Sequence, residues 1–92
     1  MPSMLGIDRE EKAALEAMGR GLRANRKRRG DSQSDAADRC GVSRETYRLM
    51  ELGTPGTGVG YWIRAIRLYG DMGQLEALFP SSLFDQLAGN KR

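Results

Sequence analysis

Histidine is absent from this chain of 92 residues, and cysteine occurs once, at Cys40. The usual Cys/His zinc sites are therefore excluded, and a single cysteine cannot form an internal disulfide. No nucleophile and base occur in a pattern typical of an active site, so we expect a protein that is not an enzyme and needs neither metal nor cofactor. We expect Cys40 to be a small core residue, because it falls on the inner face of a predicted helix.

Long apolar runs are also missing. No stretch approaches the roughly 20 residues that span a membrane. The N-terminal sequence MPSMLGIDREEK lacks the charged and then apolar pattern of a signal peptide. We therefore expect one small cytoplasmic domain without a membrane partner, with a thin core because so short a chain buries only roughly 60–65% of its unfolded surface.

The first predicted helix covers residues 8–28, after a flexible N-terminal arm at residues 1–7. Acidic side chains lie near its start and basic ones near its end, as the helix dipole favours. Its inward stripe, at helical spacing, is Ala14, Leu15, Met18 and Leu22. Two glycines, Gly19 and Gly21, weaken this helix; they mark either close approach of a neighbouring helix or fraying, and the sequence does not distinguish these.

The segment QSDAADRCGVSRETYRLME, residues 33–51, predicts two short helices joined by a sharp turn. Ser32 is the expected N-cap of the second helix, which runs to about Cys40, and Gly41 fits the left-handed position that ends it. Ser43 then caps a third helix over residues 44–52. Small or apolar side chains bury one face of each helix, which leaves the front of the third helix polar and free. Such a helix fits the major groove of B-DNA.

Positive charge is concentrated just before this pair of helices. The net charge is only +3, but residues 20–29 (RGLRANRKRR) hold six basic side chains and no acidic one. Such a run can be a solvated helix end, which the helix dipole favours. Placed directly before a helix-turn-helix pattern, it is better interpreted as a surface that contacts DNA phosphates.

The rest of the chain predicts two more helices and no strand. The loop GTPGTGVG, residues 53–60, lacks the ending of a phosphate-binding P-loop, so we do not expect a nucleotide site. The fourth helix, residues 60–69, should point Trp62, Ile63, Ile66 and Tyr69 inward. A fifth, residues 72–79, ends before Pro80, and SSLFDQLAG can add one further turn. The predicted fold is all-α, with five helices.

This pattern resembles the XRE (phage-repressor-like) helix-turn-helix family, with its compact lambda-repressor-like domain. The resemblance covers residues 15–79 and is strongest in RRGDSQSDAADRCGVSRETYRLMELG. Its specific marks are Ser32-Gln33, Ala37, Gly41, Val42-Ser43, Thr46, Glu51 and Gly53. More loosely, the sequence from GVGYWIRAIRLYG to LEALFPSSLFDQL is similar to HipB-like antitoxins, which are small bacterial regulators encoded beside a toxin.

The resemblance implies roles for individual residues. The base-contacting residues would be Gln33, Arg44, Glu45 and Arg48, with arginine suited to guanine and glutamate to cytosine. The phosphate-contacting residues would be Arg23, Arg26, Lys27, Arg28, Ser43 and Thr54. Arg26 and Glu51 match a structural pair that joins the first helix to the end of the third.

Three positions depart from the family pattern. Asp31 stands where an apolar residue is usual, and Ala36 replaces a large aliphatic one. Both should thin the core and leave room for Trp62 or Tyr47. Leu49 occupies a position that is often polar, so we expect it to pack or to touch a thymine methyl group.

Three functions compete at this point. The first is a sequence-specific repressor, dimeric on a palindromic operator in double-stranded DNA; the second is a HipB-like antitoxin that represses its own operon and binds a kinase-like toxin. The third is an interaction bundle that has lost DNA binding. We divide the chain into the arm (1–7), the DNA-binding domain (8–80) and a short tail (81–92). The candidate contacts for a homodimer or another partner are Leu75, Leu78, Phe79, Leu83 and Phe84.

Overall fold

The computed structural model describes residues 6–80, and all the regular structure within them is helical. The elements in chain order are α1 (Arg9–Arg28), α2 (Gln33–Cys40), α3 (Arg44–Leu52), α4 (Val59–Tyr69) and the 3₁₀ helix η1 (Met72–Leu78). The predicted all-α fold is confirmed over this part of the chain. No helix in it combines the length and apolar character needed to cross a membrane. The tail (81–92), with Leu83 and Phe84, and residues 1–5 of the arm lie outside the described residues.

Reciprocal hydrogen bonds begin the first two helices. The Asp8 carboxylate accepts from the backbone N–H of Glu11, and the Glu11 carboxylate accepts from the backbone N–H of Asp8, both at 2.8 Å. Ser32 and Asp35 make the same pair of bonds at the start of α2. Each box satisfies two backbone groups at a helix end, so the local sequence fixes where α1 and α2 begin.

The turn between α2 and α3 depends on Gly41. This residue has φ of 70°, the left-handed conformation that a glycine adopts at little cost. The backbone N–H of Val42 then donates to the carbonyl of Ala37 at 3.0 Å. Ser43 caps α3 by accepting from the backbone N–H of Thr46. The chain therefore reverses within three residues, and α3 packs against α2.

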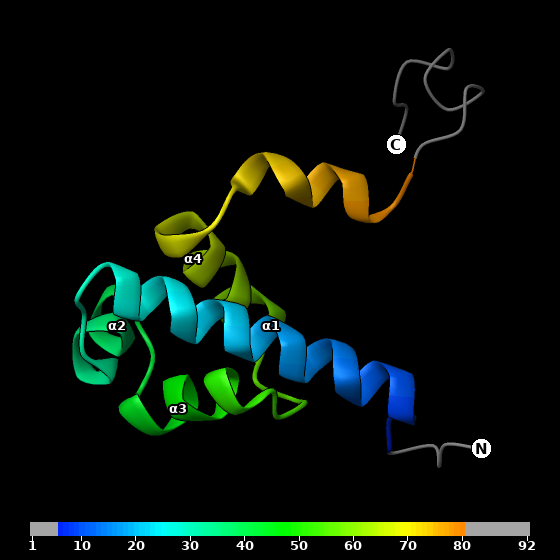
Figure 1. Cartoon of the computed structure of the whole chain (residues 1–92), viewed down its shortest axis with the longest axis horizontal. Coiled ribbons are helices and arrows are strands. Elements are labelled where there is room, and N and C mark those ends of the chain that lie inside the picture. The colour runs from blue at the N-terminus through cyan, green and yellow to red at the C-terminus, as the bar shows by residue number, and fades with distance from the viewer. Residues whose placement is uncertain (1–5, 81–92) are drawn as a thin grey trace.

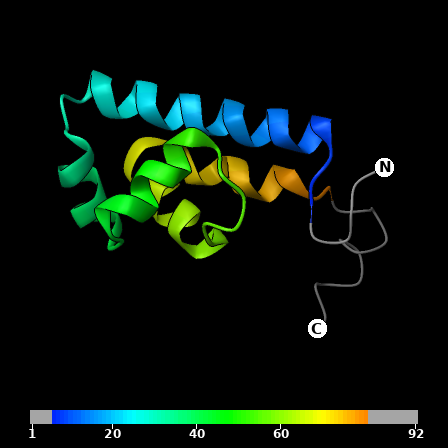
Figure 2. The ribbon, with the colours of Figure 1, turned by 90° about the horizontal axis from the view of Figure 1, so that it is seen from below.

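Helix α1 lies between α3 and α4. Figure 1 shows α3 on one side of α1 and α4 on the other, with α2 at its C-terminal end. The view from below shows α3 in front of α1 and η1 on the far side (Figure 2). The core lies where α1 to α4 meet and consists of Leu22, Ala36, Ala37, Cys40, Tyr47, Met50, Trp62, Ala65 and Tyr69. Cys40 is fully buried, as predicted.

The predicted inward stripe of α1 is only half right. Leu22 is buried and Leu15 is half-buried, but Ala14 is exposed and Met18 is 45% exposed. With 20 residues, α1 is much longer than its neighbours of 9 and 11 residues. Its N-terminal half extends past them (Figure 1). Helical spacing identified the correct face but not how far the covering helices reach.

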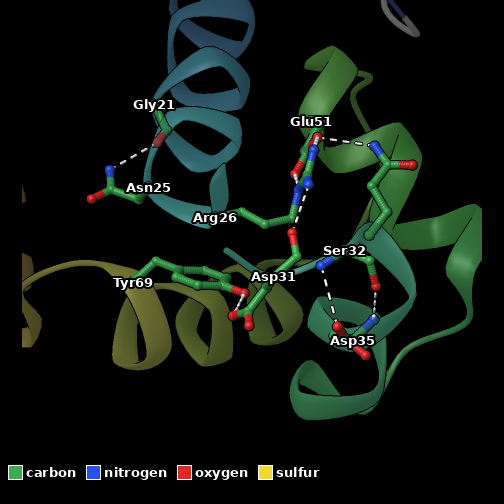
Figure 3. Close-up of polar contacts among 9 residues, drawn as sticks. Gly21, Asn25, Arg26, Asp31, Ser32, Asp35, Glu51 and Tyr69 are labelled. Atoms are coloured by element: carbon green, nitrogen blue, oxygen red, sulfur yellow. Dashed lines mark hydrogen bonds and ion pairs between the residues drawn. The ribbon is translucent and has the colours of Figure 1, made fainter. Parts of the chain in front are cut away.

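Asp31 does not leave a gap in the core. Its Oδ2 accepts a hydrogen bond from the Tyr69 hydroxyl at 2.7 Å (Figure 3) and one from Arg39 at 3.4 Å. Ala36 and Tyr47 are both fully buried in the core. Burial and the bond to Asp31 raise the pKa of Tyr69 to about 12. A polar bridge between the α1–α2 turn and α4 thus replaces the usual apolar contact.

The last described element is less tightly packed. Helix η1 is a 3₁₀ helix that contacts α4. Leu75 is half-buried, whereas Leu78 is 65% exposed and Phe79 is 85% exposed. Within residues 6–80, Leu78 and Phe79 are therefore surface residues and not part of the core.

Candidate nucleic-acid interface

One side of α3 is open to solvent. We call it the α3 front, and it is formed by Arg44, Glu45, Arg48 and Leu52, all exposed. These positions fall on one side of a helix with 3.6 residues per turn. Met50 lies opposite this side, Tyr47 and Glu51 lie toward the edge nearest Arg44, and all three are buried. The α3 front is therefore accessible to a macromolecule while the other side anchors the helix.

Glu45 and Arg48 on the α3 front form an ion pair. Arg48 Nε donates to Glu45 Oε1 at 3.1 Å, and Nη2 donates to Oε2 at 2.8 Å. The hydrogen bond from Arg48 lowers the pKa of Glu45. Both side chains stay largely accessible, with exposed fractions of 47% for Arg48 and 65% for Glu45.

A polar hollow borders the α3 front. It has a volume of about 340 Å³ and is lined by Arg23, Arg26, Gln33, Arg48, Glu51 and Leu52. The fold thus brings together side chains from α1, from the start of α2 and from α3. Four sequence-predicted contacts meet there: Arg23, Arg26, Gln33 and Arg48.

The Arg26–Glu51 pair forms the floor of this region. Arg26 Nε donates to Glu51 Oε2 at 2.6 Å, and Nη2 donates to Oε1 at 3.1 Å (Figure 3). Arg26 Nη1 donates to the Asp31 carbonyl at 2.9 Å. The side chains are only 9% and 4% exposed. Each of the three nitrogens of Arg26 thus makes one internal hydrogen bond, which supports the structural role, and its phosphate contact stays a prediction.

Glu51 is ionised despite its burial. Burial opposes ionisation, but hydrogen bonds from Arg26 and Gln33 outweigh it and lower the pKa of Glu51. The hydroxyl of Tyr47 is also buried and has no hydrogen-bond partner among the described residues. The charge of Glu51 therefore depends on the contacts from α1 and α2.

Glu51 also fixes the orientation of Gln33. The Nε2 of Gln33 donates to Glu51 Oε1 at 2.9 Å. An ionised carboxylate only accepts hydrogen bonds, so the amide nitrogen of Gln33 must face it. The Oε1 and the second N–H of Gln33 remain, and they can pair with N6 and N7 of adenine.

The basic residues of α1 divide between two sides. Arg23 and Lys27 are exposed and lie one helical turn apart, and Arg23 lines the polar hollow. Arg28 follows Arg26 by two residues, so it points roughly 200° away around the helix. It donates to the Asn25 side chain at 2.5 Å. Arg23 and Lys27 therefore lie on the side of α1 nearer the polar hollow than Arg28, and the phosphate contacts of all three stay predictions.

The other two residues predicted to contact phosphate, Ser43 and Thr54, are less available for such a contact. Ser43 Oγ accepts from the Thr46 backbone N–H and donates to Thr46 Oγ1, both at 3.0 Å, so its donor is occupied by the cap. Thr54, just after α3, is half-buried. Both stay predictions, as do the base contacts of Arg44, Glu45 and Arg48.

Sequence reasoning overlooked Leu52. Leu49, the residue expected to pack or touch a thymine, is half-buried, whereas Leu52 is 57% exposed on the α3 front. Its position four residues after Arg48 could have indicated this, because residues four apart share a helix face. Leu52 is thus the exposed apolar side chain of the α3 front.

Across residues 6–80, no three Cys, Asp or Glu side chains are grouped so that they could hold a metal ion. Neither curated proteins nor solved structures gave a significant match to the chain. A profile of the helix-turn-helix domain family matches residues 17–79, which include the C-terminal part of α1 and all of α2, α3, α4 and η1. The chain therefore belongs to the helix-turn-helix domain family of DNA-binding proteins.

Proposed function

We propose that this protein is a sequence-specific repressor that binds a palindromic operator as a dimer and acts by binding alone. The observation that carries the proposal is the α3 front. Arg44, Glu45 and Arg48 are exposed there next to the polar hollow. An α-helix is about 10–12 Å wide and the major groove about 12 Å, so α3 can enter the groove with these side chains against base edges.

The two sets of basic side chains have different tasks in this proposal. Arg44 can donate two hydrogen bonds to O6 and N7 of guanine, and a good bidentate contact of this kind contributes about 1–3 kcal/mol of discrimination between bases. Arg23 and Lys27 on α1 contact phosphates. Such contacts position the protein and add affinity that falls with salt, but carry no sequence information.

A dimer provides the remaining affinity. One α3 reaches only a few base pairs, whereas two copies related by a two-fold axis contact half-sites about 34 Å apart. The exposed Leu78 and Phe79 on η1 offer an apolar surface for the second copy. The tail residues Leu83 and Phe84, which lie outside the described residues, belong to the same proposed contact.

A second function uses the same surfaces. In the HipB-like branch of XRE regulators, the DNA-binding body also binds a kinase-like toxin. The resemblance of residues 58–87 to that branch favours this alternative, as does the exposed apolar side of η1. Co-purification of the full chain with the product of a neighbouring kinase-like gene would select it over a plain repressor.

Selection from a randomised duplex DNA library tests the proposal directly. The full chain should enrich a palindromic sequence, and gel retardation should show much weaker binding to a scrambled duplex at the same salt. Binding to both duplexes should weaken as salt rises from 50 to 200 mM. If no sequence is enriched and no duplex is retarded even at low salt, the proposal is wrong and an interaction bundle remains.

A further inference from the structure

We propose that Glu45 is a positioning residue for Arg48 and does not itself contact a base. Glu45 holds the guanidinium of Arg48 so that its outer edge meets one guanine per half-site. This inference rests on the proposed function, since it concerns how the α3 front discriminates between bases.

The geometry of the pair leaves one edge of Arg48 available. The guanidinium is planar and carries five N–H groups. Glu45 accepts from Nε and from one N–H of Nη2, at 3.1 and 2.8 Å. The edge formed by Nη1 and the second N–H of Nη2 points away from the carboxylate. Two parallel N–H donors are what O6 and N7 of guanine accept, so this edge suits guanine and no other base.

Holding Arg48 in place favours selective binding. A free arginine side chain explores many rotamers and loses that freedom when it binds. The contact with Glu45 fixes the plane of the guanidinium before DNA arrives. Glu45 also offsets repulsion between Arg48 and Arg23, which line the same hollow. The pair is exposed, with 47% and 65% of the two side chains accessible, so we expect its effect to be a few-fold.

A direct contact of Glu45 with cytosine fits the geometry less well. Each carboxylate oxygen already accepts a hydrogen bond from Arg48. A cytosine amino group would have to share one of these oxygens with the guanidinium. A carboxylate near DNA phosphates is also repelled by them, unless a nearby cation such as Arg48 offsets its charge.

A double-mutant cycle on base discrimination separates the two roles. Four full-length proteins are compared with the wild type: Arg48→Ala, Glu45→Ala, the double variant, and Glu76→Ala as the control. Glu76 is exposed on η1, far along the chain from α3. All these side chains are exposed, so circular dichroism should show unchanged helix content. For each protein, the affinity for the enriched duplex is measured against duplexes with single base-pair changes.

The expected result is that the Arg48 and Glu45 variants change the preference at the same base pair. Arg48→Ala should remove a preference for guanine at one position, by about 10-fold or more. Glu45→Ala should lower the preference at that same position by about 2–5-fold, leave guanine preferred, and have no further effect in the Arg48→Ala background. Glu76→Ala should change nothing.

Other outcomes overturn the inference. If Glu45→Ala instead abolishes a cytosine preference at a position that Arg48→Ala leaves intact, Glu45 contacts a base itself. If Glu45→Ala alters no preference, the ion pair has no role in recognition. In both cases a selective wild-type protein leaves the proposed function standing. A wild-type protein that enriches no sequence contradicts the proposed function and the inference together.

Discussion

Gly19 on α1 lies directly against the backbone of Glu51 on α3. A Cβ added at Gly19 would lie 2.3 Å from the Glu51 carbonyl oxygen. The sequence left open whether the glycines of α1 mark a close helix contact or fraying. Gly19 marks a close helix contact, because the absence of a side chain there allows the backbone of α3 to approach α1. Gly21 differs, because a Cβ there would meet nothing within 4 Å.

The two glycines should respond to alanine with opposite signs. Gly19→Ala should lower the free energy of unfolding by about 1–3 kcal/mol, since the obstructing atoms are backbone and α1 and α3 must move apart. Gly21→Ala should raise it by about 0.5–1 kcal/mol, because alanine is the better helix former and the space is open. Urea unfolding of both variants measures this. Equal changes in the two would show that the α1–α3 contact does not depend on Gly19.

Removal of the Glu51 charge should destabilise the fold strongly. Glu51→Gln leaves Arg26 buried without its counter-charge, which costs about 3–5 kcal/mol. The double variant with Arg26→Met and Glu51→Leu should lose less than the sum of the losses in Arg26→Met and in Glu51→Leu, because no buried charge is left unpaired. Urea unfolding of these four variants at pH 7 measures the losses. Additive losses would mean that the two residues are not coupled.

Acid should weaken the same pair. The pKa of Glu51 in the folded protein is below its ordinary value of 4.5. The unfolded state therefore binds this proton more readily, and the stabilisation is complete above about pH 4.5 and lost as pH falls through the folded pKa. Unfolding measured from pH 7 to pH 3 should show a steeper loss for the wild type than for Glu51→Gln. Parallel curves would contradict the prediction.

Two arginines near the proposed DNA should have different effects. Arg44→Ala should reduce discrimination at one base pair by about 10-fold or more, since a bidentate base contact is lost. Arg23→Ala should weaken binding to all sequences alike and reduce the salt slope by about one phosphate contact. Affinities for enriched and scrambled duplexes at several salt concentrations distinguish them. Arg28→Ala is the control, and a loss there equal to that of Arg23→Ala would refute the division of α1 into two sides.

Variants of Gln33 test whether this residue, held by Glu51, contacts adenine. Both Gln33→Ala and Gln33→Glu should remove an adenine preference at one position of the enriched sequence. Gln33→Glu should also lower the free energy of unfolding below that of Gln33→Ala, because it places a second carboxylate against Glu51. Binding profiles and urea unfolding check the two effects. An adenine preference that survives in Gln33→Ala would exclude this contact.

The exposed end of η1 should control assembly. Phe79→Asp should shift the protein from dimer to monomer in sedimentation velocity without loss of helix content, since Phe79 is 85% exposed. Gln74→Ala, an exposed change on the same helix, should leave the dimer intact. A wild-type protein that stays monomeric at high concentration would show that η1 is not the interface.

Local sequence determined where the helices begin and turn. Ser32 and Ser43 cap α2 and α3, and Gly41 makes the turn between them. These features act within a few residues, so the sequence alone predicts them. The exposure of Arg44, Glu45 and Arg48 follows equally from the spacing of the buried residues between them. The helix-turn-helix family was recognisable from the sequence because its marks are local in the same way.

Only the tertiary structure decided how distant residues combine. The sequence predicted the Arg26–Glu51 pair through a resemblance, but not that the same carboxylate fixes the amide of Gln33 or that Arg26 also donates to the Asp31 carbonyl. It grouped Arg28 with Arg23, and the helix separates them. It expected Met18 inside, and Met18 is 45% exposed because it lines an open groove between α1 and α4. Spacing along a chain gives the face on which a residue lies, whereas the reach of the packed neighbours decides which side chains remain available.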